Sequence, residues 1–129
     1  MKITVPVSLG ELLDKISILS IKLEKITEPD KREAITEELE ELNAVFEKSL
    51  SDEEKEKCKP YLAKLTDINR RLWPVQDILR GKEKAQSFDE EFIKTARDEY
   101  TINDERYMVK REINTTFGSD IQEKKSYYA

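Results

Sequence analysis

The sequence predicts an all-α protein, with four main helices in a bundle-like packing, short helical pieces and an extended N-terminal arm. Charged residues make up 40% of the 129 residues, whereas the chain holds only 3 glycines and 4 prolines, a composition typical of long helices. Apolar residues recur at helical spacing. Three Ser-x-x-Glu sequences, at residues 8–11, 51–54 and 87–90, have the pattern of a capping box at a helix start. We expect a single helical domain over residues 1–129.

The N-terminal segment, residues 1–7, is predicted to be extended, because its apolar side chains alternate and Pro6 is unfavourable inside a helix. A lone strand is not stable, so this arm must lie on the helices or pair with another chain. The first helix is predicted from the Ser8 cap to about residue 26. It is apolar on two sides, so we expect it to lie centrally between neighbouring helices.

The second and third helices are separated by a further capping box. Pro29 lies near the start of the second helix, where its missing N–H costs little. The apolar residues of this helix form one stripe on an acidic rod, so we expect it to pack by one face. The third helical segment begins at residues 51–54. We expect Pro60 to break it into a short and a longer helix, Pro74 to end or kink it, and Gly81 to stop it.

The last helix is predicted to run from Phe88 to about Phe117, with Gly118 as its C-cap. At about 100° per residue, its apolar residues fall on two flanks and polar residues fall between them. This polar spine comprises Glu99, Asn103, Arg106, Lys110 and Asn114. Charged groups enclosed by apolar flanks are costly unless they have partners or water. The spine therefore lines either a buried polar network or a ligand pocket.

Two acidic residues of the first helix are candidate partners for the spine. Glu11 and Asp14 lie on the back face of that helix, and Glu11 also has a capping role. If the back face meets the last helix, Asp14 is the predicted partner of Arg106 or Lys110. In the ligand interpretation the two cations bind a phosphorylated or carboxylated small molecule, because Arg offers a bidentate fork and Lys a compact charge. The candidate ligand-binding residues are Asp14, Glu99, Asn103, Arg106, Lys110 and Asn114.

The composition excludes several kinds of chemistry. There is no histidine and one cysteine, Cys58, which excludes Ser-His-Asp and Cys-His catalysis, His-ligated zinc and a Cys-rich metal centre within one chain. We expect no cofactor. The net charge is −5, and residues 28–57 hold 12 acidic and 5 basic residues, so nucleic acid is not an expected partner. Without a signal peptide, a membrane span or an intrachain disulfide, the expected compartment is the cytoplasm.

Two enzyme templates fit the sequence only in part. Helical pyrophosphatases hold metal with E-x-x-E and a later E-x-x-D; residues 37–41 supply the first motif, but the last helix lacks the second. All-helical chorismate mutases bind a dicarboxylate with Arg and Lys from several helices, whereas the first helix here lacks the expected arginine and offers lysines such as Lys15 and Lys22. We therefore expect no metal site, favour a protein that is not an enzyme and assign no catalytic residue.

Seven segments spread over nearly the whole chain carry a family resemblance: VPVSLGELLDKISIL, LW at 72–73, FDEEFIKTAR, NDER, KREIN, GS and EKKSY. They are similar to a family of small helical bacterial proteins of unknown function. The resemblance implies that members can lie near, or be joined to, glycosyltransferases of surface-polysaccharide assembly. It implies no catalytic residue. Its signature is the last helix and the Ser8–Lys15 turn.

Two functions are compatible with these observations. The first is a non-catalytic binding or accessory protein, serving a glycan-assembly enzyme as the resemblance implies. The second is a small-molecule site on the last helix, catalytic or not. Internally paired cations and an exposed apolar patch would favour the first, whereas a concave pocket with unpaired cations would favour the second. We also expect a homodimer, because two-sided apolar helices are hard to cover in a small monomer.

Overall fold

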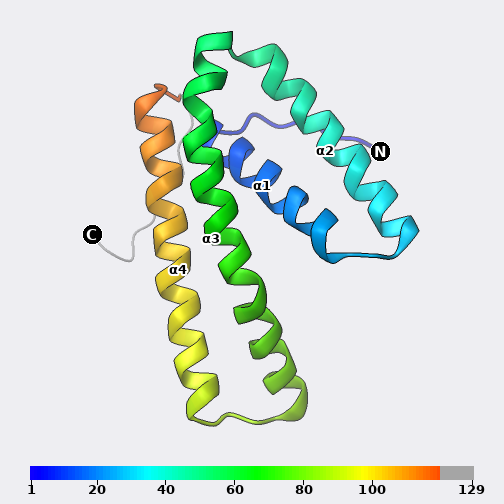
Figure 1. Cartoon of the computed structure of the whole chain (residues 1–129), viewed down its shortest axis with the longest axis vertical. Helices are drawn as coiled ribbons and strands as arrows, with labels where there is room; N and C mark the ends of the chain where they lie inside the picture. The colour runs from blue at the N-terminus through cyan, green and yellow to red at the C-terminus, as the bar shows by residue number, and fades with distance from the viewer. Residues whose placement is uncertain (120–129) are drawn as a thin grey trace.

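The computed structural model describes residues 1–119, and its four helices confirm the all-α prediction. They are α1 (Leu9–Lys25), α2 (Pro29–Ser49), α3 (Asp52–Ala85) and α4 (Glu90–Thr116). α3 and α4 form a long hairpin, α1 packs against one end of it, and α2 lies on the outer side of α1 (Figure 1). Nowhere in residues 1–119 is a helix long and apolar enough to cross a membrane. The EKKSY segment lies outside the described residues.

α1 is the central helix, as predicted, since it packs against all three others. Ser8 caps its start, with Oγ accepting a hydrogen bond from the backbone N–H of Glu11 at 3.1 Å. The predicted capping box is only half formed, because the Glu11 carboxylate pairs with α4 instead. Leu12 and Ile21 lie on opposite sides of the helix, and both are buried. Burial on two sides fixes α1 between its neighbours.

α2 begins at Pro29 and packs on α1 by a single face, as predicted, with Ile35 buried. The arm formed by residues 1–7 is exposed along its whole length. It leaves the start of α1 and runs past α2 (Figure 1), where Lys2 Nζ lies 2.9 Å from a Glu41 carboxylate oxygen. The apolar side chains of the arm remain uncovered, with Ile3 76% exposed.

α3 is one continuous helix. The break expected at Pro60 and the stop expected at Gly81 are wrong, because the helix runs through both positions and through Pro74. Each interior proline removes a backbone hydrogen bond and costs roughly 3 kcal/mol. Burial of residues such as Leu65 and Leu72 offsets this cost, since a buried aliphatic side chain contributes roughly 1.5–3 kcal/mol. The helix axis changes direction near its middle (Figure 1), as interior prolines commonly cause.

α4 begins two residues later than predicted. Its N-cap is Asp89, whose Oδ1 accepts a hydrogen bond from the backbone N–H of Phe92 at 2.9 Å. Ser87 is not the cap, because its backbone N–H donates to the carbonyl of Lys82 at 2.9 Å and holds it in the turn after α3. Asp and Ser are equally good N-caps, so the sequence pattern alone could not rank them.

α4 ends at Thr116, close to the predicted position, and its C-cap is Phe117 rather than Gly118. Gly118 follows the last turn with a φ of 64°, a left-handed conformation that glycine adopts without a steric penalty. The backbone N–H of Ser119 donates to the carbonyl of Asn114 at 2.9 Å. Together these features form a Schellman motif, which satisfies carbonyl groups at the helix end.

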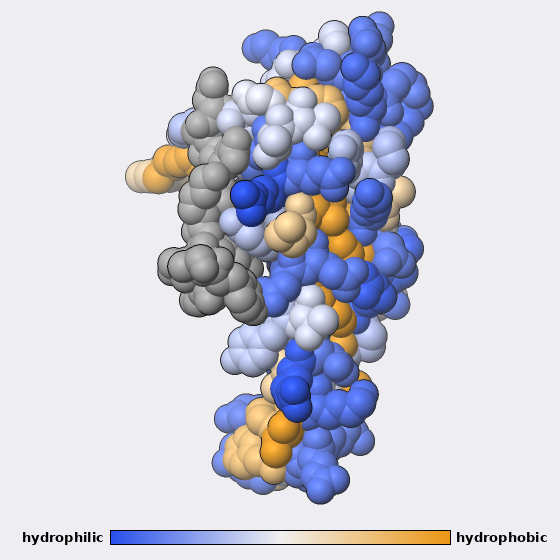
Figure 2. Space-filling model, turned by 90° about the vertical axis from the view of Figure 1, so that its left-hand side faces the viewer, coloured by the Kyte–Doolittle hydropathy of each residue, from blue (hydrophilic) through white to orange (hydrophobic). Residues whose placement is uncertain are grey.

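The apolar side chains of α4 are buried to different extents along the helix. Ile113 lies completely buried in a core cluster with Leu13 and Leu65. On the other flank, Ile93 is 56% exposed and Tyr100 is 73% exposed. The flanks are not covered along their whole length, because α1 reaches only part of α4 and the hairpin extends beyond it (Figure 1). Figure 2 shows apolar side chains gathered at the far end of this extension.

An ion pair between α3 and α4 makes stability depend on pH. Arg71 donates to both carboxylate oxygens of Glu105, at 2.9 and 3.1 Å. These hydrogen bonds lower the pKa of Glu105 below its ordinary value, although burial acts in the opposite direction. A carboxyl group with a lowered folded pKa stabilises the fold above its unfolded pKa, about 4.3, and this contribution is lost as pH falls through the folded value.

We therefore expect Glu105→Gln to lower the free energy of unfolding at neutral pH, and the difference from the parent to narrow as pH falls from about 5 toward 3. Urea unfolding at a series of pH values measures this difference. Glu90→Gln, which changes an exposed α4 carboxylate, serves as the control. A Glu105→Gln difference that stays constant with pH would contradict the assignment.

Candidate functional site

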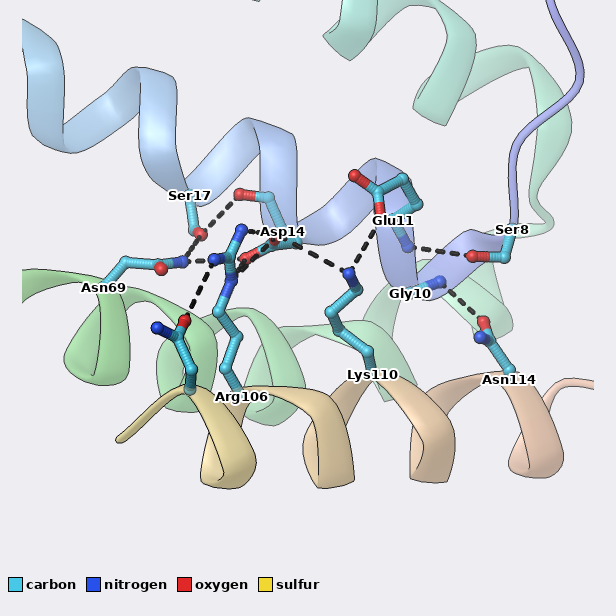
Figure 3. Close-up of polar contacts among 10 residues, drawn as sticks. Ser8, Gly10, Glu11, Asp14, Ser17, Asn69, Arg106, Lys110 and Asn114 are labelled. Carbon is cyan, nitrogen blue, oxygen red and sulfur yellow. Dashed lines mark hydrogen bonds and ion pairs between the residues drawn. The ribbon is translucent and has the colours of Figure 1, made fainter. Parts of the chain in front are cut away.

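The predicted spine of α4 meets the back face of α1 at a polar network, shown in Figure 3. Asp14 on α1 is completely buried. Arg106 on α4 donates to both oxygens of this carboxylate: Nε lies 2.9 Å from Oδ1 and 3.1 Å from Oδ2, and Nη2 also bonds Oδ2. The structure therefore confirms the predicted ion pair between Asp14 and the spine.

α3 contributes an amide to the same carboxylate. Asn69 Nδ2 donates to Asp14 Oδ1 at 2.9 Å and to Ser17 Oγ at 2.8 Å. Ser17 Oγ in turn donates to the backbone carbonyl of Asp14 at 2.7 Å. One buried carboxylate thus joins three helices. Asn69 and Ser17 were not predicted from the sequence. For Asn69 the available signal was a polar residue at helical spacing between the buried residues Leu65 and Leu72.

Lys110 forms the second ion pair of the network, one turn along α4 from Arg106. Its Nζ lies 2.8 Å from Glu11 Oε2 and 4.0 Å from Asp14 Oδ2. Lys110 is buried, whereas Glu11 is partly exposed. Two carboxylates and two cations therefore form a cluster without formal net charge. Such a cluster compensates its own charges at the interface between α1 and α4.

The end of α4 caps the start of α1. The backbone N–H of Gly10 donates to Asn114 Oδ1 at 2.8 Å, and the backbone N–H of Leu9 donates to Ser119 Oγ at 3.4 Å. These groups belong to the first turn of α1, where backbone N–H groups have no partner within the helix. A Cβ atom at position 10 would lie 2.7 Å from the carbonyl oxygen of Lys110, so only glycine allows this approach.

The structure brings three of the six candidate residues into this cluster, namely Asp14, Arg106 and Lys110. Asn114 lies one turn further along α4, where it accepts from the backbone of Gly10. Asn103 lies at the edge of the cluster, where Oδ1 accepts from Arg106 Nη1 at 3.4 Å. Glu99 lies apart from the network and lines a groove nearer the far end of the hairpin. The spine predicted from helical spacing is therefore divided between two places along α4.

A cavity of about 130 Å³ lies next to the network, between α1 and α3. Trp73 and Ile18 supply apolar walls, and Lys22 and Gln76 supply polar groups. Asn69 and Arg106 separate it from the buried carboxylate. An apolar cavity of about 150 Å³ holds benzene, so this cavity is large enough for a small molecule and too small for a nucleotide sugar.

The chemistry of the cluster is that of a satisfied polar network. Each of its two carboxylates faces a cation, and Asp14 also accepts from an amide. Across residues 1–119, no buried side-chain nitrogen or oxygen lacks a hydrogen-bond partner. In the same residues, no three acidic or cysteine side chains gather in a way that could hold a metal ion. A fully satisfied network of this kind fixes how helices pack.

Comparison with known protein families found a match over the whole chain. The model of a family of unknown function (DUF6165) matches residues 1–129. The match includes every residue of the network. No curated protein and no solved structure matches the chain.

Proposed function

The chain belongs to this family of unknown function, DUF6165, and we propose that it is a non-catalytic accessory protein that binds another protein. The observation that carries the proposal is the pairing of the two candidate cations. Arg106 and Lys110 lie against the carboxylates of Asp14 and Glu11. An incoming anion would have to displace one of these carboxylates, and a buried charge left without its partner is strongly unfavourable. The pairing therefore supports a structural role for the spine.

The N-terminal arm offers a surface for the partner. Residues 1–7 are exposed, and Ile3, Val5 and Val7 alternate along them. An extended segment can add as a strand to the edge of another protein's sheet, and its alternate side chains can fill pockets there. From what the family resemblance implies, we propose that this partner is a glycosyltransferase of surface-polysaccharide assembly in the bacterial cytoplasm.

A photo-crosslinking amino acid placed at Val5 in the full chain tests this proposal in cells. We expect one product that joins the chain to a different protein, identified by mass spectrometry, and we expect Ile3→Asp to reduce it. The control carries the same probe at Glu37, which is exposed on α2. Equal products from both positions, or no product from Val5, would overturn the proposal.

A second candidate function is favoured by the cavity beside Trp73. Lys22 and Gln76 line it together with the indole. The cavity therefore offers a cation, an amide and an aromatic face to a small carboxylated or phosphorylated molecule. Unlike the paired cations of the spine, Lys22 forms no ion pair within residues 1–119.

A thermal-shift screen against inorganic phosphate, small dicarboxylates and three-carbon phosphate esters separates the two candidates. A ligand at 100 times its dissociation constant adds about 2.7 kcal/mol to stability. For the second candidate this gain should be lost in Lys22→Ala and kept in Lys15→Ala, which alters an exposed lysine of the same helix. A panel without any shift, together with crosslinking from Val5, supports the accessory protein.

A further inference from the structure

A groove of about 500 Å³ lies between α3 and α4 in the far half of the hairpin. Its apolar lining comes from Leu79 on α3 and from Phe92 and Ala96 on α4. Charged side chains stand along its edges, with Arg80, Glu83 and Lys84 on α3 and Glu99 on α4. Within the described residues, these four side chains form neither an ion pair nor a hydrogen bond.

The groove lies on the same face of α4 that α1 covers, but nearer the far end of the hairpin. At about 100° per residue, Phe92, Ala96 and Glu99 lie on the same face of α4 as Arg106 and Lys110, which contact α1. α1 occupies that face only along part of the helix (Figure 1). The far half of the hairpin therefore presents a groove on this face that neither α1 nor α2 fills.

The uncovered apolar surface extends beyond the groove. On α4, Tyr100 and Ile93 lie beside Ala96 on the helical wheel, and both are more than half exposed. On α3, Ile78 is also exposed. Apolar side chains collect at this end of the molecule in Figure 2. Two helices alone bury one face each, and a second pair of helices is the usual way to cover the remainder.

The charges of the two helices favour a second copy as the occupant. Residues 76–86 of the α3 side hold three basic and two acidic residues, a net charge of +1. Residues 87–101 of the α4 side hold two basic and five acidic residues, a net charge of −3. In a two-fold arrangement α3 of one copy lies along α4 of the other, so each helix meets a helix of opposite net charge.

We propose that the far half of the α3–α4 hairpin is a self-association surface, where hairpins from two copies complete a four-helix bundle. In this dimer the groove between Leu79 and Ala96 receives the partner's hairpin. Arg80 and Lys84 of each copy face Glu99 of the partner subunit. The proposal does not depend on the N-terminal arm, which lies at the opposite end of α1 from this surface (Figure 1).

Sedimentation velocity over a range of concentrations tests the dimer. We expect the parent to be dimeric, and we expect Ala96→Glu, which places a charge in the groove, to weaken dimerisation by at least ~30-fold, the effect of losing one strong interface contact. The matched control is Ala63→Glu, at an exposed position of α3 near the other end of the hairpin. Circular dichroism shows whether each variant keeps its helices. A monomeric parent, or equal dimerisation in both variants, would overturn the proposal.

A charge exchange tests the two-fold arrangement itself. A copy with Glu99→Lys and a copy with Arg80→Glu and Lys84→Glu should each dimerise more weakly than the parent, because like charges then face one another. When the two are mixed, opposite charges face again on both sides of the axis, so we expect heterodimers. Absence of heterodimers would rule out this pairing of α3 with α4. Deletion of residues 1–7 should leave dimerisation unchanged, which separates this result from the function proposed for the arm.

Discussion

Asp14→Asn is expected to destabilise the fold by about 3 kcal/mol, a large part of the 5–15 kcal/mol typical of a single domain. The substitution keeps the shape of the side chain and removes its charge. Arg106 then loses the carboxylate that it contacts through Nε and Nη2, and Lys110 loses the charge of one of its two neighbouring carboxylates. Urea unfolding monitored by circular dichroism measures the loss.

The control is Asp67→Asn, which makes the same chemical change at an exposed ion pair with Arg71. An exposed pair contributes less than about 1 kcal/mol, so this variant should unfold almost as the parent does. In the double variant of Asp14→Asn with Arg106→Gln, the loss should be smaller than the sum of the two single losses, because the residues act on each other. Equal effects of Asp14→Asn and Asp67→Asn would contradict the proposed network.

Gly10→Ala is expected to destabilise the fold by at least about 2 kcal/mol, although alanine is the better helix former by about 1 kcal/mol. The added Cβ would lie 2.7 Å from the backbone oxygen of Lys110 and 2.9 Å from Asn114 Oδ1. A backbone atom cannot move aside as a flexible side chain can, so α1 and α4 must separate. This separation also weakens the ion pairs that follow along the same interface.

Gly81→Ala provides the matched comparison. Gly81 also lies inside a helix, but no atom lies within 4 Å of the position that its Cβ would take. We expect this variant to gain about 0.5–1 kcal/mol. Thermal unfolding of both variants measures the two changes in stability. A loss for Gly10→Ala with a gain for Gly81→Ala supports the close approach at Gly10, whereas a gain in both variants would show that α1 and α4 lie further apart.

The sequence was sufficient to predict the ion pair between Asp14 and the last helix, because the residues involved follow local rules. Helical spacing alone placed Arg106, Lys110 and Asn114 on one face, and the cost of burying them required an acidic partner. Asp14 met that requirement from the back of a helix already identified as central. Each of these inferences rests on helical periodicity or on charge, and both properties follow from the amino-acid sequence alone.

Properties that depend on packing between distant segments could not be predicted in this way. Helix propensity treats Pro60 as a break, whereas burial against α1 and α4 keeps α3 intact. Asn69 looks like one more polar residue until α3 is placed against the carboxylate of Asp14. Glu99 shares the spacing of the spine but lies beyond the reach of α1. In each of these three examples, the direction and length of the helix packed alongside determine the surroundings of the residue.

The joining of α1 to α4 also sets an order of events during synthesis of the chain. The contacts between Gly10 and Asn114 and between Asp14 and Arg106 span 104 and 92 residues, whereas Arg71 and Glu105 are 34 apart. Shorter loops close at lower entropic cost, so we expect the hairpin to form before α1 docks. α1 is made before the other three helices, and its contacts with α2 and α3 can form before α4 is complete. The side of α1 that carries Leu13, which packs with Ile113 of α4, has no such neighbour until α4 has been made, so it stays exposed to other chains and raises the risk of aggregation in unfinished chains.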